Sequence, residues 1–123
     1  MTRFLVVAFG GALGAAARYA VALAVAVFWK RDFPMATLLI NVSGSFVLGF
    51  FSTLAAERMP LDPLWRLLVT TGFIGAYTTF STFEYETQRL TESGALWWAV
   101  LNIAISVAAG YAAVQLGVLL ARR

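Results

Sequence analysis

The stretch GFIGAYTTFSTF, residues 72–83, decides how this chain folds. It belongs to an apolar segment of about residues 64–83, yet the stretch itself holds two glycines and four serine or threonine residues. Glycine and β-branched threonine both weaken a helix, so the pattern predicts a local break near residues 75–79. Backbone that leaves a helix at membrane depth must be buried by protein or satisfied by water or ions. Carbonyl groups freed there would offer the hard oxygen ligands that alkali cations use.

The composition of the whole chain indicates a membrane protein. Of its 123 residues, 61% are hydrophobic and 12% are charged, whereas soluble domains carry about 25% charged residues. A chain this small has too much surface for its volume to hide that apolar excess from water. About 20 helical residues cross the ~30 Å hydrocarbon layer. Four segments are long enough: about residues 4–28, 35–56, 64–83 and 95–121. We therefore predict an all-α integral membrane protein, one domain over residues 1–123, with four transmembrane helices of which the third is broken at mid-membrane.

The basic residues bear on how the segments are oriented. An even number of spans puts both termini on one side, which holds five of the nine basic residues, against three on the other side and Arg18 within the first segment. This is a weak positive-inside bias, and it would allow insertion in both orientations. The alternative is that both termini simply lie in the cytoplasm. Because the first segment contains Arg18 and leads into three more apolar segments, we interpret it as a retained helix and not as a signal peptide.

Several kinds of chemistry are excluded by residues that the chain lacks. It has no cysteine and no histidine, which removes thiol chemistry, disulfides, zinc clusters and imidazole catalysis. Without a nucleophile–base pair we do not expect an enzyme. The basic residues lie between apolar runs or at the ends, so they form no stripe for nucleic acid. Acidic residues fall in the connections or at segment ends, which favours passive conduction over coupled transport.

Small and polar residues recur at a spacing of four, which places each row on one helix face. The rows are Gly10, Gly14 and Arg18 in the first segment, Thr37, Asn41, Ser45, Gly49 and Thr53 in the second, and Asn102, Ser106 and Gly110 in the fourth. Most of the glycines and serines fit packing seams, since small residues let membrane helices approach closely. Arg18 is either functional or a post that caps carbonyls of a broken neighbour, because a cation near a helix centre costs ~2.5–3.5 kcal/mol. Asn41 is either interhelical glue or part of a functional polar row.

Phe80 and Phe83 are three residues apart and share a helix face with the nearby hydroxyl groups. Aromatic rings are electropositive at their edges. Ring edges could therefore contact a dehydrated anion without the tight grip of a full positive charge. On periodicity alone, however, ordinary packing against lipid or core is the better explanation of both rings.

Three motifs together resemble the CrcB/Fluc family of fluoride channels, and the likeness runs through most of the chain. GGALGAAARY at residues 10–19 resembles the family's GGxxGAxxRY segment. TLLINVSGSFVLG at residues 37–49 resembles its second-helix run, and GFIG with TTFSTF, at residues 72–75 and 78–83, resembles its most specific signature. Two positions depart from the family pattern. Ala76 and Tyr77 follow Gly75 where another glycine is frequent, and Asn102 stands where many members carry tyrosine.

The resemblance implies an antiparallel, dual-topology homodimer in the cell (inner) membrane, with two narrow pores between the subunits. It implies a fluoride-selective channel that passively exports fluoride and reduces its toxicity. Phe80 and Phe83 would line the fluoride path with their ring edges, and Asn41 would donate a hydrogen bond to the ion. Further polar residues of the pathway would be Thr37, Thr79, Ser81, Asn102 and Ser106. Physical reasoning also favours a dimer, because one subunit of four helices is too thin to enclose a pore.

The resemblance further implies a structural Na⁺ at the dimer centre, held by the backbone carbonyls of Gly75 and Thr78. Arg18 would sit near a vestibule and attract anions. The partners expected are thus fluoride, Na⁺, a second oppositely oriented copy and membrane lipid.

Two other functions remain open. A small dual-topology exporter of multidrug or quaternary-amine substrates is equally short, but it needs a buried carboxylate in its first helix, where this chain has Arg18 and no acidic residue. A non-transporting subunit of a larger membrane complex would explain the small-residue seams but not the TTFST cluster.

Overall fold

The computed structural model describes residues 1–59 and 62–123, and these residues form helices and short connections, with no strand. The elements are α1 (Thr2–Phe28), α2 (Met35–Glu57), α3 (Pro63–Arg66), the π-helix η1 (Leu67–Ile74), α4 (Gly75–Tyr77), α5 (Phe80–Glu92) and α6 (Leu96–Arg122). The predicted all-α fold is confirmed. Among the described residues α1, α2 and α6 are long and apolar enough to cross a membrane. The predicted third span corresponds to α3, η1, α4 and α5 in series, none of which is an apolar helix of that length.

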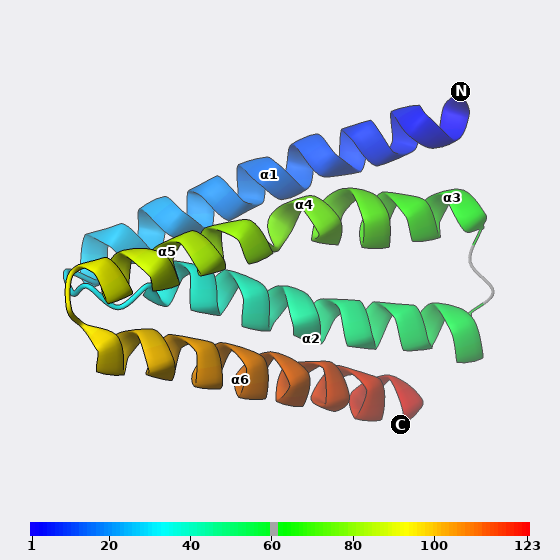
Figure 1. The fold of residues 1–123 in the computed structure, drawn as a ribbon. Coiled ribbons are helices and arrows are strands. Elements are labelled where there is room, and N and C mark those ends of the chain that lie inside the picture. Colours follow the sequence, from blue (N-terminus) through cyan, green and yellow to red (C-terminus); the bar gives the residue numbers. More distant parts are fainter. Residues whose placement is uncertain (60–61) are drawn as a thin grey trace.

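The elements lie roughly side by side in one bundle (Figure 1). The two termini and α3 lie at one end of the bundle, and the connections α1–α2 and α5–α6 lie at the other. Four passages along the bundle, with both termini at one end, are the arrangement expected from an even number of spans.

The third passage is interrupted between α4 and α5, within the stretch where the sequence predicts a break. Thr78 (φ −77°, ψ 158°) and Thr79 (φ −151°, ψ 114°) are both extended, so the helix stops and restarts there. The predicted break is therefore confirmed. The helix after it does not stop with the apolar segment near Phe83 but continues to Glu92. The second half of α5 is polar, so a search for apolar segments does not detect it. Only a few apolar residues, such as the buried Leu90, pack against its neighbours.

Glycines bring α1 close to η1. A Cβ on Gly10 would lie 3.1 Å from the Cα of Gly72, and a Cβ on Gly14 would lie 2.9 Å from the carbonyl carbon of Phe73. Neither position has room for a methyl group, so both glycines form the packing seam that the sequence predicts. The π-helical winding of η1 itself was not predicted.

A second seam joins α2 to α6. A Cβ on Gly49 would lie 3.2 Å from the Cα of Val114, and one on Gly117 would lie 2.7 Å from the backbone nitrogen of Phe50. Gly110 is different, since its nearest non-neighbour atom would be Ser45 Oγ at 3.8 Å, an ordinary contact. The α5–α6 turn also needs glycine, because Gly94 has a φ of +79°.

Candidate functional site

Asn41 of α2 holds the break open. Its Nδ2 donates to the carbonyl oxygen of Thr79 at 2.9 Å, and its Oδ1 accepts from the backbone N–H of Thr79 at 2.8 Å. The side-chain amide thus takes the place of the two backbone partners that Thr79 would have in a continuous helix. Thr79 is buried, with 9% of its surface exposed, so leaving these groups unpaired would be costly.

The carbonyl oxygens of Gly75 and Thr78 lose their regular helical donors at this break. The N–H of Thr79, which would bond the Gly75 carbonyl, donates to Asn41 instead. The N–H of Thr82, which would bond the Thr78 carbonyl, donates to the side-chain oxygen of Thr79 at 3.3 Å. These two oxygens are therefore available as hard ligands, and they are the pair that the sequence analysis assigned to Na⁺.

A groove of about 260 Å³ lies beside the break, between α2, α5 and α6. Its lining comprises Asn41, Gly44, Ser45, Leu48, Ile74, Thr78, Thr79, Phe80, Phe83, Ser106, Val107 and Gly110. The fold thus brings together Asn41, Thr79, Phe80, Phe83 and Ser106, which are distant in sequence and which the sequence analysis assigned to one pathway.

The two phenylalanine rings lie against each other with very different exposure. Their centroids are 5.7 Å apart and their planes are inclined by 40°. Phe83 is 8% exposed, whereas Phe80 is 70% exposed. One ring therefore belongs to the core of this chain, and the other is presented at its surface.

Three hydroxyl groups around the groove donate their hydrogens to protein acceptors, whereas Asn41 keeps one amide hydrogen free of any acceptor in the part of the chain that the structure describes. Thr78 Oγ1 donates to the carbonyl oxygen of Ile74 at 3.0 Å, and Thr79 Oγ1 donates to Thr82 Oγ1 at 2.9 Å. Ser106 Oγ donates to Asn102 Oδ1 over a long 3.4 Å. Asn41 uses one of its two amide hydrogens on Thr79, which leaves the second for a ligand.

A second groove, of about 390 Å³, continues from the same two rings. Its lining includes Glu84, Thr87, Gln88 and Thr91 of α5, and it shares Phe80, Phe83 and Val107 with the first groove. The two grooves therefore meet at the phenylalanine pair. These polar residues were not predicted, because the predicted third segment ends near Phe83. The spacing of four from Phe83 through Thr87 to Thr91 was the signal that could have found them.

Asn102 lies behind the groove lining and not in it. It is 1% exposed, and its Nδ2 donates to Thr87 Oγ1 at 2.8 Å. Thr87 Oγ1 in turn donates to the carbonyl oxygen of Phe83 at 2.8 Å. Asn102 thus ties α6 to the turn of α5 that carries the Phe83 ring.

Three other predicted pathway residues line neither groove. Arg18 lies half-buried on α1, and Ser81 is exposed on α5. Thr37 is buried on α2, beside the carboxyl group of Glu86. The fold therefore does not gather these residues with the phenylalanine pair within one chain.

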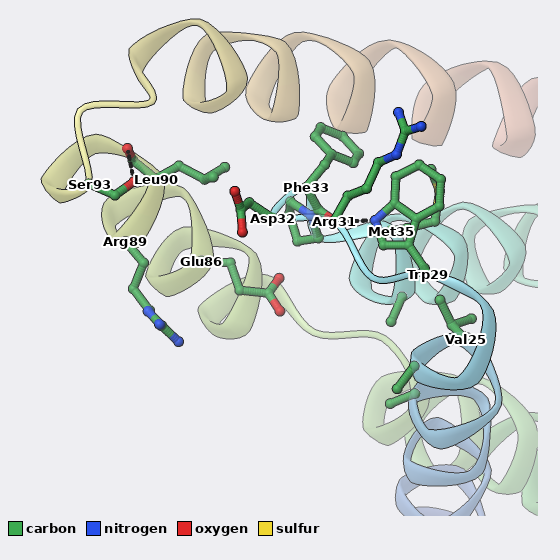
Figure 2. A pocket seen from close by; sticks show the side chains of 14 residues that line it. Val25, Trp29, Arg31, Asp32, Phe33, Met35, Glu86, Arg89, Leu90 and Ser93 are labelled. Carbon is green, nitrogen blue, oxygen red and sulfur yellow. Dashed lines mark hydrogen bonds between the residues drawn. The ribbon is translucent and has the colours of Figure 1, made fainter.

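A third cavity, of about 510 Å³, lies at the end of the bundle that holds the α1–α2 connection. Figure 2 shows Glu86 of α5 reaching into it, with Asp32 of the connection nearby and Arg89 turned away. Within the described residues, Glu86 Oε2 is buried without a hydrogen-bond partner. Glu86 was expected in a connection or at a segment end, like the other acidic residues, yet it lies in the middle of α5, where its half-buried carboxyl group faces this cavity.

Comparison with known proteins identifies the family. The family described as "CrcB-like protein, Camphor Resistance (CrcB)" matches residues 5–118. The chain belongs to the CrcB-like family. It is 45% identical over 121 residues to the fluoride-specific ion channel FluC of Solibacter usitatus. The aligned region covers 98% of this chain and 99% of that protein. It is 49% identical to FluC of Acidobacterium capsulatum, over 98% and 97% of the two chains, and 48% identical to FluC of Chlorobaculum tepidum, over 99% and 96%.

Membership in the CrcB-like family confirms the resemblance noted from the three motifs. Together with the apolar helices α1, α2 and α6, it makes this chain a multi-pass membrane protein.

Proposed function

We propose that this protein is a fluoride-selective channel of the cell (inner) membrane that passively exports fluoride and so reduces its toxicity. The observation that carries the proposal is the meeting of two grooves at the Phe80–Phe83 pair, directly beside the helix break. The relatives that cover nearly the whole chain bear the name fluoride-specific ion channel, which supports the same function.

The grooves explain how a small anion could pass without binding tightly. Ring edges and neutral amide or hydroxyl hydrogens attract a dehydrated anion, but each does so more weakly than a full positive charge. The ion can therefore leave the site as well as enter it, which conduction requires. A narrow passage would admit fluoride and exclude the larger chloride. Arg18, which lies away from the grooves, would act by attracting anions towards a vestibule.

A second copy of the chain would complete the passage. Both grooves are open at the surface of the single chain, and the ring of Phe80 is 70% exposed beside them. An oppositely oriented copy would cover two such surfaces at once and enclose two pores, as the weak charge bias permits. Inverted packing of this kind places corresponding broken helices against each other near the midplane.

A structural Na⁺ fits the residues at the break. The carbonyl oxygens of Gly75 and Thr78 lack their regular helical donors, and hard oxygens of this kind suit an alkali cation. Two ligands from one chain are few, so the same pair from a second copy would complete the set. When bound, the cation would supply a fixed positive charge and tie the two breaks together.

The test is a paired efflux measurement on purified protein in liposomes. Fluoride efflux through the membrane should be fast, beyond the rate of a carrier cycle, while chloride efflux stays at the level of protein-free liposomes. Equal fluoride and chloride efflux would refute the proposal. Efflux of neither ion, with protein that reconstitutes as a dimer, would refute it as well.

One observation favours the second candidate, a small dual-topology exporter of multidrug or quaternary-amine substrates. Such an exporter needs a buried carboxyl group, and Glu86 is half-buried with one oxygen unpartnered among the described residues. Glu86 lies on α5, however, and α1 carries no acidic residue. Uptake of a lipophilic cation driven by a pH gradient would support this candidate, and its absence alongside fluoride efflux would exclude it.

A further inference from the structure

The hydroxyl group of Ser45 lines the groove and lacks a hydrogen-bond partner within the described part of the chain. Three other hydroxyl residues share the lining, and each donates its hydrogen to a protein acceptor: Thr78 to Ile74, Thr79 to Thr82, and Ser106 to Asn102. Within residues 1–59 and 62–123, Ser45 Oγ has no hydrogen-bond partner. A serine hydroxyl in a membrane helix can bond the carbonyl one turn earlier or a group on a neighbouring helix. A free one that faces a groove is therefore a candidate ligand group.

The fold keeps open the space in front of this hydroxyl. Across the groove stands Gly110 of α6, and a Cβ placed there would lie 3.8 Å from Ser45 Oγ with no nearer non-neighbour atom. The other α2–α6 glycines, Gly49 and Gly117, are in tight backbone contact, so Gly110 is not needed for close packing in the same way. The glycine leaves room for a small ligand beside Ser45.

Ser45 also lies in register with the residues already assigned to the ion. It follows Asn41 by four residues on α2, so the two side chains share a helix face. Where this face lines the groove, the second amide hydrogen of Asn41 and the hydroxyl of Ser45 are donors without an acceptor among the described residues. A dehydrated anion needs several hydrogen-bond donors at once. A hydroxyl group can donate a strong hydrogen bond to an anion although the hydroxyl itself carries no charge.

We propose that Ser45 is an ion-contacting residue, whose hydroxyl donates to a small dehydrated anion in the groove opposite Gly110, next to the Phe80–Phe83 pair. This rests on the proposed channel function and adds to it a donor from α2. It differs from Ser106, which must first give up its bond to Asn102.

The first experiment compares serine variants in the fluoride efflux assay. Ser45→Ala should lower the fluoride rate by about tenfold, equivalent to ~1.4 kcal/mol of barrier, while Ser45→Thr, which keeps the hydroxyl, retains most of it. Ser52→Ala is the matched control, because Ser52 is exposed on the same helix and lines neither groove. Size-exclusion chromatography checks that each variant keeps the wild-type assembly. A wild-type rate in Ser45→Ala would overturn the proposal.

A second experiment uses the absence of cysteine from the chain. Ser45→Cys is nearly isosteric, and it gives the protein one thiol that a small silver ion can reach and bind. Silver should block fluoride efflux through Ser45→Cys and should not affect Ser52→Cys or the wild type. Efflux through Ser45→Cys that silver leaves unchanged would overturn the assignment even if Ser45→Ala were poorly folded.

The two proposals can fail separately. If the wild type conducts fluoride but the Ser45 variants behave like the wild type, this inference fails and the channel function stands. If the wild type carries no fluoride, both fail.

Discussion

At the scale of single residues, the side-chain amide of Asn41 supplies the hydrogen-bond partners that backbone peptide groups would supply in a continuous helix. It offers Thr79 both a donor and an acceptor, at 2.9 and 2.8 Å, so the chain can leave the helix without orphaned polar groups. The sequence leaves Asn41 open between interhelical glue and a functional polar group, and its bonds to Thr79 show the first of these roles. One amide hydrogen fixes the break, and the other is uncommitted at the groove.

The aromatic pair gives the sharpest prediction at this scale. Phe80→Ile and Phe83→Ile each remove a ring edge but keep apolar bulk, so each should lower fluoride efflux by at least about tenfold, or ~1.4 kcal/mol. Their stabilities should differ. Phe83 is 8% exposed and its replacement should lower the thermal unfolding midpoint, whereas Phe80 is 70% exposed and its replacement should leave the midpoint of the chain's own fold nearly unchanged.

Phe4→Ile serves as the control for both variants. Phe4 is 83% exposed on α1 and lines neither groove, so its replacement should change neither efflux nor the midpoint. Wild-type efflux in both Phe80→Ile and Phe83→Ile would show that the rings do not contact the ion.

At the scale of elements, the fit between α1 and η1 depends on which glycine is replaced. Gly14→Ala would place a methyl group 2.9 Å from the carbonyl carbon of Phe73, so backbone must move, and we expect a loss of about 1–3 kcal/mol. Gly11→Ala is the matched control on the same helix, since its Cβ would meet only Ala76 Cβ and the carbonyl oxygen of Gly72, both at 3.9 Å.

Thermal unfolding of the two variants in detergent, followed by tryptophan fluorescence, measures this difference. Gly14→Ala should unfold at a clearly lower temperature than the wild type. Gly11→Ala should match or slightly exceed it, because alanine favours the helix. Equal midpoints for the two variants would mean that α1 and η1 are not packed as closely as described.

The start of the helix α5 follows from local sequence, whereas its continuation to Glu92 depends on contacts with other helices. Its start is read from Thr79, whose side chain accepts from the N–H of Thr82 as a helix cap does. Its end is not visible in hydropathy, because residues 84–92 are mostly polar. Asn102 of α6 helps to hold that half in place, because its side-chain amide donates to the hydroxyl of Thr87. A contact between residues 15 apart in sequence, on two different helices, is a property of the fold and not of the local pattern.

At the scale of the whole molecule, the broken passage leaves two carbonyl oxygens that a cation would satisfy. If Na⁺ binds Gly75 and Thr78 in a dimer, replacing Na⁺ by N-methylglucamine on both sides of the liposome should lower fluoride efflux. The same replacement should lower the thermal midpoint of the dimer in detergent, because a ligand that binds only the folded state stabilises it. Returning Na⁺ should restore both quantities. Unchanged efflux and midpoint without Na⁺ would contradict the site.

The sequence by itself determined the membrane class, the four passages and the place of the break. These depend on average hydropathy and on local helix propensity, which short windows of sequence carry fully. It also determined the family, because three motifs spread over the chain match in order. Only the tertiary structure decided which polar groups are free. It showed that Asn41 pairs with Thr79, that Asn102 bonds Thr87 from behind the groove, and that Ser45, opposite Gly110, has no hydrogen-bond partner among the described residues. Whether a donor is available depends on which acceptor another helix brings within about 3 Å, and no pattern along one helix records that.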